Sequence, residues 1–185
     1  MFSHDTESVL QATAALVNTE PRASASGRDE LTSVEHVAAF FAGWAYSGAL
    51  AGTEEELEAV RALRPELRLF FTESRDEVAE HVNRVLLEAR ALPRLVRHDA
   101  YDWHLHAVPS DAPFAVRIRV ETAMALVDLV RADELGRLKV CTADDCDALV
   151  VDLSRNRSKR FCDVGNCGNR MNVTAYRARR AAAAG

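Results

Sequence analysis

The chain has 185 residues, of which 48% are hydrophobic and 28% charged, and its formal net charge is −5. This length and composition suit a soluble globular protein with one domain and a small appendage, or with two modest domains. Charged residues interrupt every long apolar run, which excludes a membrane-spanning helix. The N-terminus has neither the basic nor the apolar segment of a secretory signal, so we expect a cytoplasmic protein with reduced thiols.

The charges are unevenly distributed along the chain. Residues 1–136 hold 13 Arg against 23 Asp and Glu, whereas residues 137–185 hold 10 Lys and Arg against five Asp. Lys139 and Lys159 are the only lysines, so nearly all the basic side chains are arginines, whose planar guanidinium suits phosphates and guanine edges. An acidic body with a basic tail is a hint of contact with a polyanion.

The first 136 residues predict a mostly helical body. Thr53, followed by a run of Glu, and Thr72 or Ser74 are the starting signals of two of its helices. Pro65 falls inside one apolar stripe and is expected to kink or split that helix. Apolar residues recur at helical spacing in four segments, residues 8–18, 31–47, 54–67 and 75–89.

The period of the apolar residues changes to two after residue 95. A first alternation is followed by a proline-bounded segment and then by a second alternation. We therefore predict a β-hairpin near residues 99–120, followed by a helix that ends near Gly136. The alternating apolar residues are Tyr101, Trp103, Leu105 and Ala107, then Phe114, Val116, Ile118 and Val120.

The body offers few groups arranged for catalysis. It has no glycine-rich phosphate loop, no cysteine nucleophile and no HExxH motif, so we expect that the protein is not an enzyme. His104 and His106 would share one face of a strand and could bind a metal, but a polar sheet face is the favoured interpretation. Arg61, Arg64 and Arg68 could line an anion pocket, although a solvated helix face is favoured for them.

All four cysteines lie in the last 45 residues, as two pairs with four intervening residues each. Cys141 and Cys146 form the first pair, and Cys162 and Cys167 form the second, fifteen residues later. In a reducing compartment this clustering favours one tetrahedral Zn²⁺ bound by four thiolates over disulfides or buried free thiols. Four protein ligands leave no open coordination position, so the ion is predicted to be structural.

Residues 137–185 predict a small treble-clef-like zinc finger that follows the body without a flexible linker. We expect a strand over 137–140, a knuckle at the first cysteine pair, a β-hairpin with strands 148–153 and 160–162, and a helix from Cys167 to about Ala183. Together with the body this predicts a mainly helical α+β fold with two domains, residues 1–136 and 137–185. Knuckle, hairpin and helix are too small to bury a core, so the metal must stabilise them.

The tail resembles the CGNR zinc finger family. The tetrapeptide Cys167-Gly-Asn-Arg170 is present, and the family pattern Asp-x-Ser-x-Asn-x-basic is matched by Asp152, Ser154, Asn156 and Arg157. Phe161 stands where the family commonly has Trp before the third cysteine.

The body resembles the ABATE domain, which accompanies this finger. The resemblance is carried by Leu16-Val-Asn-Thr19, by Asp29-x-Leu31 and by Trp44, with Val17 where a Phe is usual. Proteins of this kind are described as stress-induced transcription regulators, so the resemblance implies a regulator with a structural zinc ion.

Basic residues of the tail are the candidates for contact with nucleic acid. Four lie around the predicted hairpin turn, and three lie on the C-terminal helix at spacings that share a face. A solvated basic rim is the alternative for all of them, and Asn169 and Arg170 could instead lock the zinc site. The candidates are Arg155, Arg157, Lys159, Arg160, Arg170, Arg177 and Arg180.

The first hypothesis is a transcription regulator whose zinc module binds DNA or RNA and whose body senses a small-molecule effector or a partner. The rival is a protein-interaction module whose basic face meets an acidic surface, such as the body of a second subunit in a homodimer. A third is a small-molecule-binding or enzymatic body that uses His104 and His106 or the Arg61 series. A redox role through thiolate oxidation and zinc release is a further alternative.

Overall fold

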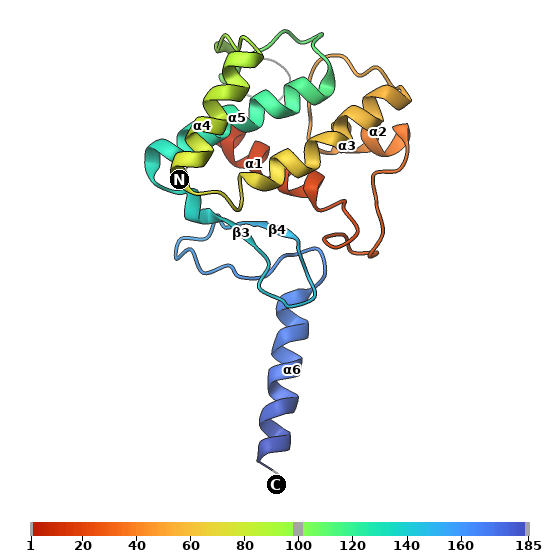
Figure 1. Ribbon diagram of the computed structural model, residues 1–185, viewed down its shortest axis with the longest axis vertical. Coiled ribbons are helices and arrows are strands. Elements are labelled where there is room, and N and C mark those ends of the chain that lie inside the picture. Colours follow the sequence, from red (N-terminus) through yellow and green to blue (C-terminus); the bar gives the residue numbers. More distant parts are fainter. Residues whose placement is uncertain (1, 98–101, 184–185) are drawn as a thin grey trace.

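The computed structural model describes residues 2–97 and 102–183 as a helical body, a small cysteine-bearing module below it and a long C-terminal helix (Figure 1). The mainly helical α+β fold predicted from the sequence is confirmed. The elements, in chain order, are α1 (His4–Val17), α2 (Val34–Gly43), α3 (Glu54–Leu69), α4 (Arg75–Glu88), β1 (Arg94–Val96), β2 (His104–His106), α5 (Phe114–Ala132), β3 (Leu138–Val140), β4 (Leu149–Val151) and α6 (Cys167–Ala182).

The starts of α2, α3 and α4 are encoded by capping residues. The side chains of Ser33, Thr53 and Ser74 each accept a hydrogen bond from a backbone N–H of the first turn. Ser74 also forms a capping box, because the carboxylate of Glu77 accepts the Ser74 backbone N–H at 2.8 Å. Pro65 does not split α3, which is continuous from Glu54 to Leu69. Its buried apolar stripe compensates for the missing hydrogen bond, as Leu57, Val60, Leu63 and Leu67 are all buried.

Of the predicted hairpin, only a strand at His104–His106 is present among the described residues, and its partner is not the predicted one. Antiparallel β1 and β2 pair Arg94 with His106 and Val96 with His104, whereas residues 114–120 form the start of the 19-residue helix α5. This helix lies in the centre of the body against α1, α3 and α4. It is therefore buried on several sides, and Ala115 and Arg117, which stand between the apolar residues, are buried as well. The alternation of apolar and polar residues over 114–120 thus did not indicate a strand with one exposed face. Tyr101, which belonged to that pattern, lies outside the described residues.

The tail also differs from the predicted β-hairpin. The antiparallel partner of β4 is β3, with Leu138 opposite Val151 and Val140 opposite Leu149, and residues 160–162 form no strand. The predicted return segment instead runs beside the knuckle, where the Thr142 N–H donates to the Arg160 carbonyl at 3.0 Å. The cause is the buried Asp152, whose carboxylate accepts backbone N–H groups of Ser154 and Lys159 and so turns the chain away from a ladder.

The sheet of β3 and β4 joins the module to the body. Leu138, Leu149 and Val151 belong to the same apolar core as α1, α3 and α5. The side chain of Asn18 pairs with β4 like a neighbouring strand, accepting the Leu149 N–H at 2.7 Å and donating to the Leu149 carbonyl at 3.0 Å. One face of this sheet therefore belongs to the core of the body, while Val150 and the four cysteines belong to a second buried cluster.

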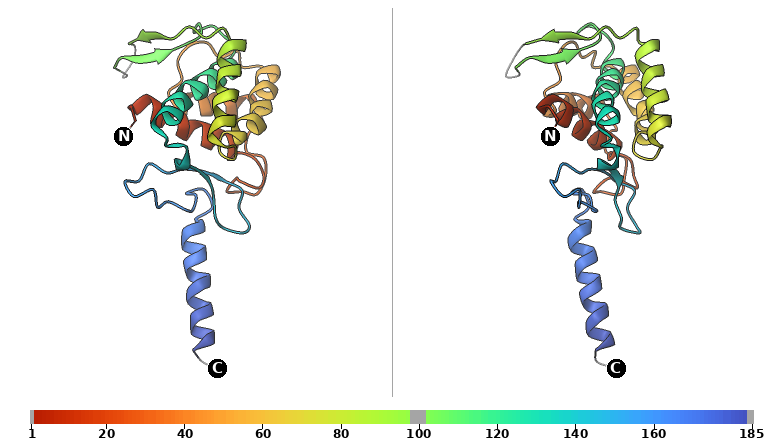
Figure 2. Two further views of the ribbon diagram at one scale, coloured as in Figure 1. Left: turned by 60° about the vertical axis from the view of Figure 1, so that its left-hand side comes forward. Right: turned by 90° about the vertical axis from the view of Figure 1, so that its left-hand side faces the viewer.

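Helix α6 extends away from the rest of the protein in every view (Figures 1 and 2). Cys167 is its one buried residue among those described, and residues 172–183 are all exposed. Within residues 2–97 and 102–183 we find no helix with both the length and the apolar character that crossing a membrane would require.

Candidate zinc centre, basic surface and body cavity

The four cysteines meet at one point of the tail, as predicted. They are buried, none forms a disulfide, and their sulfurs all lie within 4.8 Å of one another. The Sγ atoms of Cys146 and Cys162 are 3.7 Å apart, and those of Cys162 and Cys167 are 3.6 Å apart. Four sulfurs at about 2.3 Å from a tetrahedral ion would be about 3.8 Å apart, so the residues fit one Zn²⁺. Bound there, the ion has a purely structural role.

Arg170 closes the outer side of this centre. Its guanidinium donates to Cys167 Sγ at 3.1 Å, to both carboxylate oxygens of Asp145 at 2.6 and 3.0 Å, and to the Gly165 carbonyl at 3.2 Å. Burial opposes the ionised form of Cys167 most strongly, but the hydrogen bonds from Arg170 and from the other three cysteines together outweigh it, and the pKa of this thiol is lowered. Arg170 thus stabilises the thiolate that a metal requires and connects the start of α6 to the first knuckle.

A second polar centre, around Asp152, fixes the loop between β4 and the third cysteine. Asp152 is fully buried and accepts hydrogen bonds from Lys139 Nζ at 2.6 Å, from the Ser154 N–H and Oγ–H, and from the Lys159 N–H. Lys139 also donates to the carbonyls of Arg157 and Lys159. Burial would raise the pKa of Asp152, but these donors overcome it and hold the pKa well below its usual range.

The arginines of α3 form neither an anion pocket nor a solvated face. Arg64 is buried and donates to both carboxylate oxygens of Asp29 at 2.8 Å and to the Thr19 hydroxyl at 2.9 Å. The hydrogen bond from Arg64 is the main reason that the pKa of Asp29 falls to about 2. Arg68 donates to Glu20 and, at 2.8 Å, to the Asp147 carbonyl of the module. These ion pairs hold the loop after α1 and support the junction with the tail.

The sequence profiles of two families match the chain in these two regions. The profile of the CGNR zinc finger matches residues 137–180, and that of ABATE, described as "Putative stress-induced transcription regulator", matches residues 11–133. The chain belongs to the ABATE family and carries a CGNR zinc finger. A comparison with curated proteins found no match. In the finger, the first and last residues of the Cys-Gly-Asn-Arg tetrapeptide are a metal ligand and the arginine that holds it.

The predicted nucleic-acid contacts divide into two groups in the structure. Arg157 pairs with Glu134 at 2.6 Å, Lys159 pairs with Asp163 at 2.6 Å, and Arg170 belongs to the zinc centre. The other four are exposed, and no carboxylate within residues 2–97 and 102–183 forms an ion pair with them. These four are Arg155, Arg160, Arg177 and Arg180.

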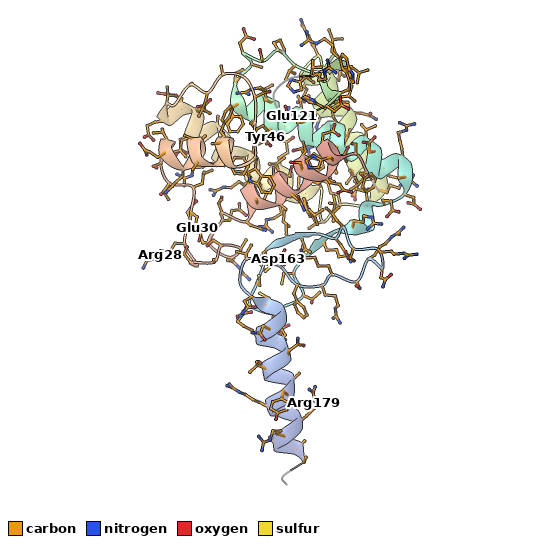
Figure 3. The ribbon with its side chains drawn as sticks, turned by 180° about the vertical axis from the view of Figure 1, so that it is seen from behind. Arg28, Glu30, Tyr46, Glu121, Asp163 and Arg179 are labelled. Atoms are coloured by element: carbon orange, nitrogen blue, oxygen red, sulfur yellow. The ribbon has the colours of Figure 1, made fainter. Side chains whose placement is uncertain are left out.

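The CGNR helix, α6, carries one more arginine than we predicted. Arg179 projects from it into solvent, exposed and without an acidic partner in the described part of the chain (Figure 3). At 3.6 residues per turn, Arg177 and Arg180 lie about 60° apart around the helix, whereas Arg179 lies about 160° from Arg177, and Asn172 and Tyr176 fall between Arg179 and Arg180. The helix contains no acidic residue. We predicted contact for arginines three or seven residues apart, because these share a helix face, and Arg179 follows Arg177 by only two residues.

The ABATE domain contains a cavity of about 270 Å³ that the sequence did not predict. It lies between α1, α5, β2 and the loop of residues 44–47. His104 and His106 line it, with their Nε2 atoms 3.1 Å apart, as do Tyr46 and Glu121. Figure 3 shows Tyr46 and Glu121 inside the body, far from α6. No spacing rule joins residues that come from four separate elements.

Arg117 fixes the loop that carries Tyr46. Its guanidinium is buried and donates to the carbonyls of Ser47, Ala49 and Ala112. It also stacks on the rings of Phe41 and Phe114. Gly48 has a positive φ of 92°, and any Cβ there would lie 2.3 Å from the Ser110 carbonyl oxygen, so the loop needs glycine at this point. The loop that forms this wall of the cavity is therefore fixed by hydrogen bonds to Arg117.

Proposed function

We propose that this protein is a transcription regulator that contacts nucleic acid through α6 and the adjacent loop of the CGNR finger, while its ABATE domain binds a small effector. The observation that carries the proposal is the exposed surface of α6 over residues 172–182. Arg177, Arg179 and Arg180 lie on it without acidic partners among the described residues. Unpaired arginines on a projecting helix favour phosphate contact over a role in the fold.

The dimensions of α6 suit a nucleic-acid groove. Its 16 residues extend about 24 Å at 1.5 Å per residue, and the major groove of B-DNA, about 12 Å wide, admits an α-helix. Asn172 and Tyr176 lie among the arginines and supply an amide for base edges and a ring for stacking. Arginine forks bind phosphate or the O6 and N7 atoms of guanine.

The loop before the third cysteine extends this surface. Arg160 and Asn169 line the same shallow depression at the start of α6, which places the exposed Arg160 beside the first turn of the helix. Arg155 is exposed at the tip of the same loop. Arg157, Lys159 and Arg170 are neutralised by acidic partners, so we assign them to holding the module and α6 to contact.

The zinc ion takes no chemical part in this proposal. Four thiolates fill its coordination sphere, and the ion holds the start of α6 on the knuckle. We likewise propose no catalytic activity for the protein.

The test is the salt dependence of binding to a short DNA duplex and a single strand. Full-length protein should bind at about 50 mM salt and weaken steeply toward 200 mM, because phosphate contacts release counterions. Replacing Arg177, Arg179 and Arg180 together by Ala should reduce the slope of log K against log salt by up to about 0.9 for each phosphate that is no longer neutralised. A matched control replaces three exposed arginines of the body, Arg28, Arg84 and Arg94, by Ala.

Two results would overturn the proposal. One is no binding by the wild-type protein to either nucleic acid at low salt. The other is an equal loss in the control and in the α6 variant, which would reveal a mere effect of net charge. A salt-sensitive dimer without nucleic-acid affinity, detected by size in solution, would favour the protein-interaction module instead.

A further inference from the structure

Glu121 is a half-buried carboxylate without a partner in the described part of the chain, which is unusual inside a helical domain. It lies on the central helix α5, faces the ABATE cavity, and forms no hydrogen bond or ion pair with the described residues. The hydroxyl of Tyr46, which lines the same cavity from the loop of residues 44–47, is buried and also has no partner among the described residues. Buried polar groups are almost always hydrogen-bonded, because leaving one unsatisfied costs about 1–3 kcal/mol. The Tyr46 hydroxyl is such a group, and Glu121 on the same cavity is a half-buried carboxylate without a partner among the described residues, so both are placed to be completed by a ligand.

The fold contains a cation that could have neutralised Glu121 and uses it elsewhere. Arg117 lies one helical turn before Glu121 on α5, near enough to influence its charge. Its guanidinium donates instead to the carbonyls of Ser47, Ala49 and Ala112. The negative charge of Glu121 therefore remains available to whatever enters the cavity.

The other charges around the cavity point to a positive ligand. Asp5 and Asp128 add two more carboxylates, and Asp128 accepts a hydrogen bond from Thr6 at 2.8 Å. Arg131 is the one arginine of the lining and is exposed at the surface. An anionic ligand would meet three carboxylates, so the electrostatics disfavour it.

The cavity does not suit a bare metal ion. Among residues 2–97 and 102–183, the four cysteines are the only group of three or more His, Cys, Asp or Glu whose ligand atoms come within 4.8 Å of one another. Its walls also include Val9, Trp44 and Met124, which offer apolar and aromatic contact. Its volume of about 270 Å³ lies just below the roughly 300–1,000 Å³ of drug-sized sites. The ligand is therefore a small organic molecule.

We propose that the ABATE cavity binds a small organic amine, as its ammonium ion, attached to an apolar or aromatic body. Glu121 is its counter-ion, and Tyr46 offers its hydroxyl oxygen to a second ammonium proton. The apolar part lies against Trp44 and Met124. This inference names the effector class of the proposed regulator and so rests on the assignment of effector binding to this domain.

The experiment compares three probes of one shape and different charge on the full-length, zinc-loaded protein. They are phenethylamine, the neutral 2-phenylethanol and the anionic 3-phenylpropionate. Binding is measured by calorimetry and by the shift in thermal unfolding. We expect phenethylamine to bind at least tenfold more tightly than either of the others. Equal binding of all three, preference for the anion, or no binding of phenethylamine at millimolar concentration would overturn the proposal.

Three variants locate the site. Glu121→Gln should weaken phenethylamine binding at least tenfold and leave 2-phenylethanol nearly unchanged, and Tyr46→Phe should weaken the amine several-fold. Glu80→Gln removes an exposed carboxylate of α4 that lies outside the cavity, and it should change nothing. Unchanged amine binding in Glu121→Gln, or in Tyr46→Phe if the first variant does not fold, contradicts the assignment.

The pH dependence supplies a readout that a merely structural role would not give. Burial raises the pKa of Glu121 to about 7 against the opposing charge of Arg117. Phenethylamine should therefore bind more tightly from pH 6 to 8 as Glu121 ionises. The titratable and charged groups around it are Tyr46, His104, His106, Arg117, Asp5, Asp128 and Arg131, and all of them are retained in Glu121→Gln. Glu121→Gln removes only the ionisation of Glu121, so an equally steep profile in this variant would overturn the inference.

The same samples separate this inference from the nucleic-acid proposal. Loss of amine binding with intact, salt-dependent DNA binding would concern the cavity alone. Intact amine binding without DNA affinity would leave the cavity as an effector site and overturn the role of α6.

Discussion

The zinc finger and the ABATE cavity treat their polar groups in opposite ways. In the finger, Asp152 is buried and fully supplied with donors, and Arg170 uses its whole guanidinium on the zinc centre. In the cavity, Glu121 and the Tyr46 hydroxyl have no partner in the described part of the chain. Paired groups hold a fold, whereas unpaired ones reduce stability and persist where binding requires them. The comparison separates residues that stabilise the fold from residues that are available to bind a ligand.

Removing the metal should have the largest effect, because the paired groups of the finger depend on it. A chelator, or Cys146→Ser, should unfold residues 138–166, since binding of Zn²⁺ contributes about 10 kcal/mol or more to such modules. The shared core predicts that the body is also destabilised, because Leu138, Leu149 and Val151 lose their anchor. Zinc content, far-UV circular dichroism and thermal unfolding are the measurements. Full stability without metal would contradict the structural role, and recovery on adding zinc is the control.

The second prediction concerns Asp152 without touching the metal ligands. Asp152→Asn should lower the free energy of unfolding by about 3 kcal/mol, because it leaves Lys139 without its counter-ion and places an amide against two N–H donors. Unfolding in urea, monitored with zinc bound, measures this loss.

Asp163→Asn is the matched control for Asp152. It breaks an ion pair of the same module with Lys159, but the side chain of Asp163 is 86% exposed. Exposed pairs contribute about 0–1 kcal/mol, so the change should be small. Equal effects of the two variants would show that Asp152 is not the centre of the loop.

Some parts of this structure were predictable because one local rule decided them. Four cysteines with metal-ligand spacing led directly to the zinc centre, and the start of α4 was narrowed to Thr72 or Ser74, of which Ser74 is the cap. The prediction for α5 was wrong because burial on several sides removes the periodicity that distinguishes helix from strand. The predicted pairing of β4 with residues 160–162 was also wrong. The sequence showed Asp152 as part of a motif, but it did not show that Asp152 is buried and turns the chain there.

The cavity could not be predicted for a different reason. Tyr46 and Glu121 are far apart in the sequence and become neighbours only when Arg117 fixes the loop after α2 against α5. Glu121 also fell at the end of the predicted hairpin, where a carboxylate would have been solvated. Spacing rules detect sites that one element carries, whereas this site depends on packing.

The last prediction has the opposite sign, an increase in stability, and tests the comparison most directly. The pKa of Glu121 is raised from 4.5 to about 7 in the folded protein, so its carboxyl group stabilises the fold below pH 4.5 and this contribution is lost as the pH rises through 7. Glu121→Gln keeps the neutral form at every pH. Without ligand, it should match the wild type near pH 5 and be more stable at pH 8 by about 2 kcal/mol, after allowing for partial solvation. Urea unfolding at both pH values measures the difference, with Glu80→Gln as the control. A loss of stability at pH 8 would mean that Glu121 holds the fold, and the division between paired and unpaired groups would fail at its most important residue.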